Sequence, residues 1–262
     1  MPNRRLRVPA LPNQVPTAPG LPIHDAAYAG DVDALQRELA SGVDPNVVDP
    51  RGRTPLICLC GAASDSGDDD ASRIDCLNVL IDAGANPSAT ETVTTNGNRM
   101  TPLLCAVSSG TTALLAALLD AGADVNCHDG NHRTVLHYAT LAEHRNVDCT
   151  HAHMRLLVNA GANVDVPDNA GQTALDFADW YGSPWMCPTL LRAGATIRAE
   201  ATDARWGPSA YIRKVRAAGG IRKYERTHLN ALVASFAPKF SHLLPPEMVR
   251  GVVAYAFHVG DY

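Results

Sequence analysis

Residues 101–126 read TPLLCAVSSGTTALLAALLDAGADVN, and this stretch decides the fold. Thr101 can cap the first turn of a helix, and Pro102 follows at a position where its missing N–H costs nothing. The apolar residues after Pro102 share one helical face: Leu103, Ala106 and Val107. The run ALLAALLDAG predicts a second helix that ends at Gly122, since glycine suits the left-handed position after a helix. The stretch therefore predicts a pair of short helices.

Five segments of the chain share this pattern. They begin at residues 21, 54, 101, 134 and 173 with LPIH, TPLI, TPLL, TVLH and TALD. The openings are 33, 47, 33 and 39 residues apart, so the basic unit is 33 residues and the two longer gaps hold insertions of 14 and 6. The glycine that ends the second helix returns at positions 42, 84, 161 and 194. Such a period indicates a repeat protein, in which each unit buries its apolar face only by stacking on its neighbours.

The recurring motif resembles the ankyrin repeat, whose signature is T-P-L-H-x-A-A followed by a leucine-rich helix and G-A-D-V-N. The resemblance covers residues 21–198, about two thirds of the chain. It implies an all-α fold, an ankyrin-repeat solenoid of helix pairs with β-hairpin fingers, here followed by a C-terminal helical cap. The stretches DPRGRT (Asp49–Thr54) and DNAGQT (Asp168–Thr173) are typical of the tight turns at such finger tips.

The predicted domain organisation has three parts. Residues 1–20 contain five prolines and are expected to form a disordered, proline-rich arm. Residues 21–198 hold the five repeats. Residues 199–262 form a C-terminal helical segment, with helices expected at 211–220, 221–237 and 245–257. These helices would cover the exposed apolar edge of the fifth repeat.

The resemblance also implies where a partner would bind. Ankyrin repeats resemble one another in the residues that stack and differ at the finger tips and on the inner helices. The positions of this chain that match the variable ones are Tyr28, Arg51, Arg53, Met100, Asn131, Arg133, Asn169, Gln172, Trp180 and Tyr181. Each has the alternative of being an ordinary exposed side chain. For Trp180, Tyr181 and Trp185 the alternative is burial under the C-terminal helices.

The predicted function is that of a protein–protein interaction adaptor or scaffold with no intrinsic catalysis. An alternative comes from the LLPPEMV stretch at 243–249, which resembles the start of an F-box, a motif that docks on the ubiquitin-ligase adaptor Skp. The candidate docking residues are Leu244, Pro245, Glu247, Met248 and Val252. Only 13 residues follow Val249, which is too few for a full F-box. A plain helical cap explains the same residues.

Other chemistry has weaker support in the sequence. A short stretch gathers several potential metal ligands, but their spacing matches no closed zinc site: His144, Asp148, Cys149, His151 and His153. Asp68–Asp70 lacks the spaced oxygen ligands of a calcium loop. We therefore expect no metal and no cofactor. The resemblance implies structural roles for His24 and His137, which stand at the His position of T-P-L-H.

One modification is implied by the resemblance. The Asn of G-A-D-V-N is hydroxylated in related ankyrin proteins, and Asn126 matches that position best, followed by Asn46, Asn86 and Asn163. The alternative is that this Asn only ties the turn together by hydrogen bonds.

Charge and cysteine content complete the predictions. Residues 21–198 carry a net charge of −12 and residues 199–262 a net charge of +4. An acidic body argues against nucleic acid as the main partner.

The seven cysteines are scattered and form no disulfide framework, which favours a reducing compartment. With no signal-peptide core and no apolar run of membrane-spanning length, we expect a monomer in the cytoplasm or nucleus.

Overall fold

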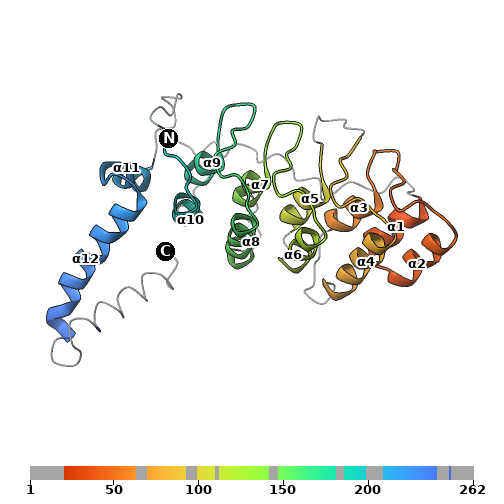
Figure 1. Cartoon of the computed structure of the whole chain (residues 1–262), viewed down its shortest axis with the longest axis horizontal. Helices are drawn as coiled ribbons and strands as arrows, with labels where there is room; N and C mark the ends of the chain where they lie inside the picture. The colour runs from red at the N-terminus through yellow and green to blue at the C-terminus, as the bar shows by residue number, and fades with distance from the viewer. Residues whose placement is uncertain are drawn as a thin grey trace, which may run out of the picture. The chain divides into compact units, whose positions relative to one another are not determined.

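The structure is a computed structural model that describes residues 21–62, 70–92, 99–109, 112–141, 147–180, 186–198, 209–240 and Met248. The described residues form helices joined by turns (Figure 1). They contain no β-strand, only an antiparallel bridge between His128 and Thr134. The predicted β-hairpin fingers are therefore tight turns in the part of the chain that is described.

The chain divides into two units, Met1–Phe177 and Ala178–Tyr262, which are described separately. The helices of the first unit begin with four pairs: α1 (Pro22–Ala29), α2 (Val32–Ala40), α3 (Pro55–Gly61), α4 (Asp70–Asp82), α5 (Pro102–Ser109), α6 (Thr112–Asp120), α7 (Val135–Leu141) and α8 (Val147–Asn159). The boundary between the units falls inside α9 (Ala174–Trp180). The second unit contains the remaining helices: α10 (Met186–Arg192), α11 (Ala210–Ala217) and α12 (Ile221–Phe240).

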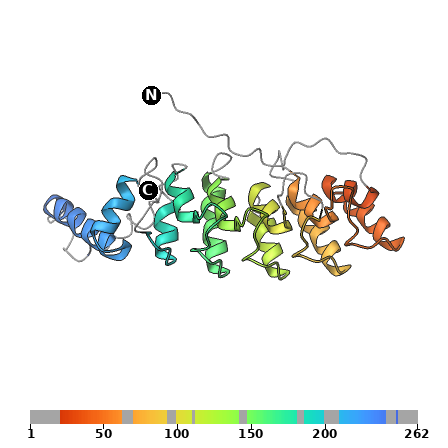
Figure 2. The ribbon, with the colours of Figure 1, turned by 90° about the horizontal axis from the view of Figure 1, so that it is seen from above.

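The first unit is a stack of helix pairs in chain order. The first helices of successive pairs contact one another, α1 with α3, α3 with α5 and α5 with α7. The second helices do the same, from α2 through α4 and α6 to α8. Figure 2 shows these pairs side by side. This nearest-neighbour packing is the arrangement that the 33-residue period predicts.

Helix starts and ends follow the predicted signals. The Oγ1 of Thr101 accepts a hydrogen bond from the backbone N–H of Leu104 at 3.3 Å, so the predicted cap is confirmed. The glycine that ends the second helix of each pair has a positive φ in every repeat, from 85° at Gly122 to 102° at Gly194. These values lie in the left-handed region, which only glycine enters at little cost.

The core of the stack is made by its first helices. Every residue of α5 from Pro102 to Ser108 is buried, and so is every residue of α7. By contrast, α2 buries only Leu35 and presents polar residues to solvent. A polar outer helix suits a terminal repeat, because no further unit covers it.

In the second unit, the helices α11 and α12 follow the last repeat in the chain. The Oγ of Ser209 caps α11 by accepting from the N–H of Ile212, and α12 contacts both α10 and α11. Arg192 on α10 forms a 2.7 Å ion pair with Glu225 on α12. The helices expected at 211–220 and 221–237 are therefore present.

Other expectations fall outside the described residues. These are the arm at residues 1–20, Asp68 and Asp69 of the stretch weighed as a calcium loop, and the helix expected at 245–257 except for Met248. The domain boundaries predicted from the sequence stay predictions. No helix in the described part of the chain has the length and apolar character needed to cross a membrane.

Candidate partner-binding surface

The second, fourth and fifth fingers of the first unit are each built on a buried aspartate. In the second finger, the Oδ1 of Asp49 accepts hydrogen bonds from the N–H groups of Arg51 and Arg53, both at 2.9 Å. Equivalent pairs of bonds form in the fourth and fifth fingers: Asn131 and Arg133 to Asp129 at 2.8 Å, and Ala170 and Gln172 to Asp168 at 2.9 Å. The acidic side chain therefore fixes the backbone that carries the variable residues.

The electrostatics of the second finger stabilise this arrangement. The Asp49 carboxylate also accepts from Nε and Nη2 of Arg53, at 2.8 and 2.6 Å. Burial acts to raise the pKa of Asp49, but the hydrogen bonds and the positive charge of Arg53 outweigh it and lower that pKa below its ordinary value. The Arg53 guanidinium is thereby held in one orientation.

The third finger departs from this design, and one predicted site residue is wrong as a result. Glu91 replaces the aspartate, and its N–H donates to the carbonyl of Met100 across the insertion. Met100 is only 3% exposed, and its Sδ lies 3.5 Å from the hydroxyl of Tyr138. The apolar thioether is placed in the core instead of at the finger tip, so Met100 is not a partner-binding residue.

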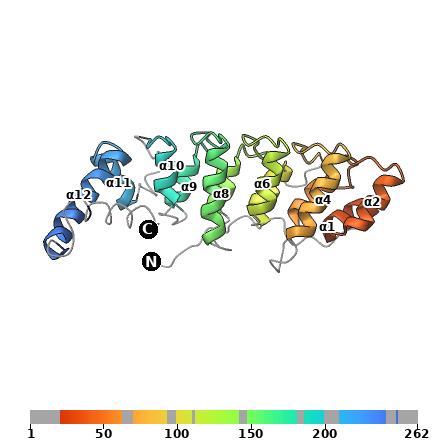
Figure 3. The same cartoon turned by 60° about the horizontal axis from the view of Figure 1, so that its bottom comes forward.

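Neighbouring fingers are joined to one another through their backbones. The N–H of Asn169 donates to the carbonyl of Asn131 at 2.9 Å, and its Nδ2 donates to the carbonyl of Gly130 at 3.3 Å. In the same way, the N–H of Thr92 donates to the carbonyl of Gly52 at 3.0 Å. The fingers project from one side of the stack in Figure 3. These bonds join the second finger to the third and the fourth to the fifth, and we name the row of finger tips the finger edge.

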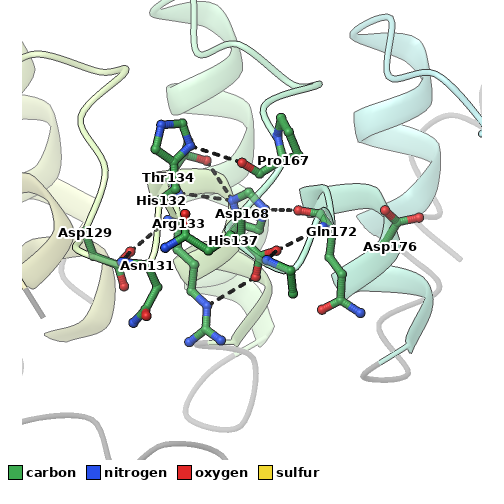
Figure 4. Close-up of polar contacts among 12 residues, drawn as sticks. Asp129, Asn131, His132, Arg133, Thr134, His137, Pro167, Asp168, Gln172 and Asp176 are labelled. Atoms are coloured by element: carbon green, nitrogen blue, oxygen red, sulfur yellow. Dashed lines mark hydrogen bonds and ion pairs between the residues drawn. The ribbon is translucent and has the colours of Figure 1, made fainter. Parts of the chain in front are cut away.

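Buried histidine fixes the finger edge to the helices, as Figure 4 shows for the fourth repeat. The Nδ1 of His137 lies 3.0 Å from the hydroxyl of Thr134, and its Nε2 lies 3.0 Å from the carbonyl of Gln172 in the next repeat. Burial lowers the pKa of His137. His24 makes the equivalent contact with the carbonyl of Arg53 at 2.9 Å. The structural role expected for both histidines is confirmed.

The structure brings most of the predicted finger residues together on this edge: Arg51, Arg53, Asn131, Arg133, Asn169 and Gln172. Arg133 is half-buried, with its Nε 3.6 Å from Oδ2 of Asp168 (Figure 4). Its guanidinium carbon lies 5.6 Å from the ring centre of Phe177. The distance between Nε of Arg133 and Oδ2 of Asp168 is short enough for an ion pair but too long for a hydrogen bond. The arginine head is therefore held by charge and by the aromatic face.

Other predicted residues lie elsewhere. Tyr28 is 46% exposed on α1 of the first repeat. Trp180 is half-buried and belongs to the second unit. Tyr181 and Trp185 lie outside the described residues. Their roles in binding stay predictions.

Sequence reasoning missed two exposed residues of the fourth finger, His128 and His132. The signal was visible in the alignment of the repeats. His132 stands where the second and fifth fingers have Gly52 and Gly171, and it adopts the same positive φ, 63°. A histidine in that conformation is uncommon and marks this finger as different.

The asparagines of the finger bases connect successive repeats. The Oδ1 of Asn126 accepts from the N–H of Asn163 at 2.8 Å, and that of Asn46 accepts from the N–H of Asn86 at 2.8 Å. These bonds support the structural alternative for Asn126. Hydroxylation of Asn126 stays a prediction.

The residues weighed as metal ligands at 144–153 do not form a described cluster. His153 points into the core and is only 1% exposed. Across the described residues there is no group of three or more histidine, cysteine or acidic side chains that could hold a metal ion.

Only one of the five candidate adaptor-docking residues is described. Met248 is helical and 55% exposed. Leu244, Pro245, Glu247 and Val252 lie outside the described residues. The resemblance to an F-box therefore stays a prediction.

Comparison with known proteins agrees with this architecture. A family model for ankyrin repeats (3 copies) matches residues 23–129, 62–149 and 114–201. Inversin of Mus musculus is 30% identical over 177 residues, which cover 67% of this chain and 15% of that protein. Neurogenic locus notch homolog protein 1 of Xenopus tropicalis is 32% identical over 168 residues, covering 64% of this chain and 6% of that protein.

The E3 ubiquitin-protein ligase KEG of Arabidopsis thaliana is 27% identical over 165 residues, covering 62% of this chain and 9% of that protein. The chain thus spans between 6% and 15% of the length of these curated relatives. Family-model matches that together extend from residue 23 to residue 201 cover well over half of the sequence. The chain therefore belongs to the ankyrin-repeat family.

Proposed function

We propose that this chain is an adaptor or scaffold that binds a partner protein along the finger edge of its first unit and has no catalytic activity of its own. Ankyrin repeats act in protein–protein interaction, and the finger edge gives that function a surface. The observation that carries the proposal is the pre-organisation of the edge. Its exposed Asn and half-buried Arg side chains stand on backbone fixed by Asp49, Asp129 and Asp168.

Pre-organised side chains suit binding because little conformational entropy is lost when a partner docks. Arg53 is held by Asp49, and Arg133 by Asp168 and Phe177. Arginine is among the residues that contribute most to protein interfaces, and its planar head donates several hydrogen bonds at once.

The described thiols support the absence of catalysis. Burial raises the pKa of Cys58 and Cys60 to about 12 and that of Cys127 to about 11. The other described cysteines shift in the same direction: Cys76, Cys105 and Cys187. A nucleophilic cysteine needs the opposite shift, toward the thiolate.

A charge-reversal pair tests the finger edge. The variant Arg51→Glu/Asn131→Glu changes two finger side chains, and Gln36→Glu/Arg37→Glu makes the same change in charge at exposed positions of α2. Affinity capture with quantitative mass spectrometry should recover the same specific proteins with the wild type and the α2 variant, and lose them with the finger variant. Equal recovery by both variants would exclude the finger edge as the binding surface.

The second candidate is a substrate receptor of a Skp/cullin-type ubiquitin ligase that docks through the C-terminal F-box-like helix, and one observation favours it. Met248 exposes 55% of its surface, which is what a docking residue requires and a buried cap residue does not. One relative is named as an E3 ubiquitin-protein ligase. Direct binding of a purified Skp-type adaptor to the full chain tests the idea. Met248→Asp should abolish binding, whereas Ala234→Asp at an exposed site of α12 should not.

We further propose that the chain is a monomer of the cytoplasm or nucleus. The scattered cysteines support a reducing compartment, since none of the six described ones is joined in a disulfide. Sedimentation equilibrium and imaging of a fluorescent fusion would check the two statements. A dimer at micromolar concentration, or secretion of the fusion, would contradict them.

A further inference from the structure

Two exposed histidines of the fourth finger lie against each other. The ring centres of His128 and His132 are 4.2 Å apart, and the ring planes are inclined by 32°. Both side chains are exposed to solvent. Two tetrahedral zinc ligands at the usual Zn–N distance stand about 3.3 Å apart. Ring centres 4.2 Å apart bring the two imidazoles near enough for one ion to bridge them once the rings turn toward it.

The hydrogen bonds of the two rings determine which nitrogens are available. The Nδ1 of His128 lies 3.0 Å from the carbonyl oxygen of Asp129. The Nδ1 of His132 lies 3.1 Å from the carbonyl oxygen of Pro167 in the next finger (Figure 4). A carbonyl oxygen only accepts, so each Nδ1 carries the proton and donates it. In the neutral rings, each Nε2 therefore keeps its lone pair.

This is the arrangement found around histidine ligands of metals. A ligating imidazole usually donates its other N–H to a carbonyl or carboxylate, which fixes the tautomer and orients the ring. Here main-chain carbonyls do this for both rings. The acceptor of His132 lies on the fifth finger, so the contact between fingers also positions one of the two rings.

The backbone of His132 supplies an independent reason to look for a role. Gly52 and Gly171 occupy the equivalent place with φ near 76°, where glycine is unstrained, whereas His132 holds φ 63°. Gly at this position would give the same turn at a lower conformational cost. The histidine costs conformational free energy without adding to the stacking core, which favours a role for its side chain.

We propose that His128 and His132 form a two-imidazole site for a divalent transition-metal ion such as Zn²⁺ or Cu²⁺. Imidazole is a preferred ligand of both ions. No third side-chain ligand stands in a cluster with them among the described residues, so water or a group from a bound protein completes the coordination. The site departs from the expectation drawn from the sequence, which weighed the ligands at 144–153 and the carboxylates of Asp68–Asp70 and predicted no metal.

The site lies on the finger edge, because Asn131 and Arg133 flank His132 in the chain. The His132 ring points toward Pro167 and away from the side chains of Asn131 and Arg133 (Figure 4), so the open coordination positions stand on the finger without facing the side of those two residues. The metal proposal does not depend on the identity of any partner, and its test uses the chain alone. Failure of the metal site would leave the proposed adaptor function untouched.

Titration of the full chain with ZnCl₂ or CuCl₂ tests the proposal. For Zn²⁺, two-dimensional NMR of the ¹⁵N-labelled imidazoles should show the Nε2 signals of His128 and His132 moving together. Isothermal titration should give one ion per chain at this site. The other fingers provide the substitutions. His132→Gly introduces the residue found at the equivalent positions Gly52 and Gly171, and His128→Val introduces the residue found at the equivalent position Val48.

Each variant should weaken Zn²⁺ binding by about tenfold or more, since loss of even an outer-shell partner has an effect of that size. The variant Cys149→Ala/His151→Ala should bind as the wild type does. His132→Gly relieves the positive φ but removes the contact with Pro167, so its urea unfolding curve is measured beside that of the wild type, and a similar midpoint shows that loss of binding does not reflect unfolding. Unchanged affinity in either histidine variant, or shifts confined to other histidines, would overturn the proposal.

Discussion

At the scale of single residues, His153 on α8 is a polar side chain buried in the apolar core. It is 1% exposed, and neither ring nitrogen has a hydrogen-bond partner. The equivalent residue is apolar in the other repeats: Ala34, Cys76, Leu114 and Met186. A buried polar group without a partner costs about 1–3 kcal/mol of stability. Burial also lowers the pKa of His153 to about 4, because the charged form would lose its hydration.

We predict that His153→Leu stabilises the protein by about 1–3 kcal/mol at pH 7, measured by urea unfolding, because leucine places no polar group in the apolar site. The contrasting change is His137→Leu, which removes a histidine bonded through both nitrogens and should destabilise the protein. Destabilisation by both changes would show that His153 has a partner in solution.

The same residue predicts a dependence on pH. Between the folded pKa of about 4 and the ordinary value of 6.5, the unfolded chain binds more protons at His153 than the folded chain does. Stability should therefore fall as the pH is lowered from about 6.5 toward 4. His153→Leu should remove this part of the acid sensitivity in unfolding curves measured at pH 7 and pH 5. An unchanged pH profile would contradict the assignment.

At the scale of the element, α1 and α7 begin at equivalent positions with different residues. Thr134 precedes α7 and its hydroxyl lies 3.0 Å from Nδ1 of His137. Leu21 precedes α1, supplies no cap, and leaves Nδ1 of His24 buried without a partner. Leu21 is 41% exposed, so its side chain contributes little to the core.

The change Leu21→Thr should therefore stabilise the protein by about 1 kcal/mol, because the hydroxyl can both cap α1 and accept from or donate to His24. Denaturant unfolding and hydrogen exchange of the amides at the start of α1 would measure the effect. Thr134→Leu is the reverse control and should lower stability. A loss of stability with Leu21→Thr would mean that Leu21 contributes more by burial than its exposure indicates.

At the scale of the first unit, stability is distributed along a stack in which each helix pair contacts its neighbours in the chain order. A terminal repeat has one neighbour and a central repeat has two. A destabilising substitution in a central repeat therefore weakens the packing of more repeats than the same substitution in a terminal repeat.

Leu35 on α2 and Leu115 on α6 form a matched pair for this test, since both are fully buried and both stand seven residues before the glycine that ends the helix. Each change to alanine should cost about 2–5 kcal/mol locally. Hydrogen exchange should show loosening confined to α1 and α2 for Leu35→Ala, but spreading to α4 and α8 for Leu115→Ala. Equally local effects would contradict nearest-neighbour coupling.

The sequence by itself determined the repeat register, the helix starts and the helix ends. These features depend on local chemistry: a threonine hydroxyl reaches the third N–H of its own helix, and only glycine enters the left-handed region freely. The finger positions could also be predicted, because Asp49 and Asp168 bind backbone within four residues of themselves.

Only the tertiary structure decided where long-range contacts place individual side chains. Met100 has the register of a finger residue, but it lies in the core against the Tyr138 hydroxyl from the next repeat. His128 and His132 are separated by three residues in a loop whose path depends on the carbonyl of Pro167 from the following finger. Such contacts join residues more than 30 positions apart, and a local pattern carries no information about them.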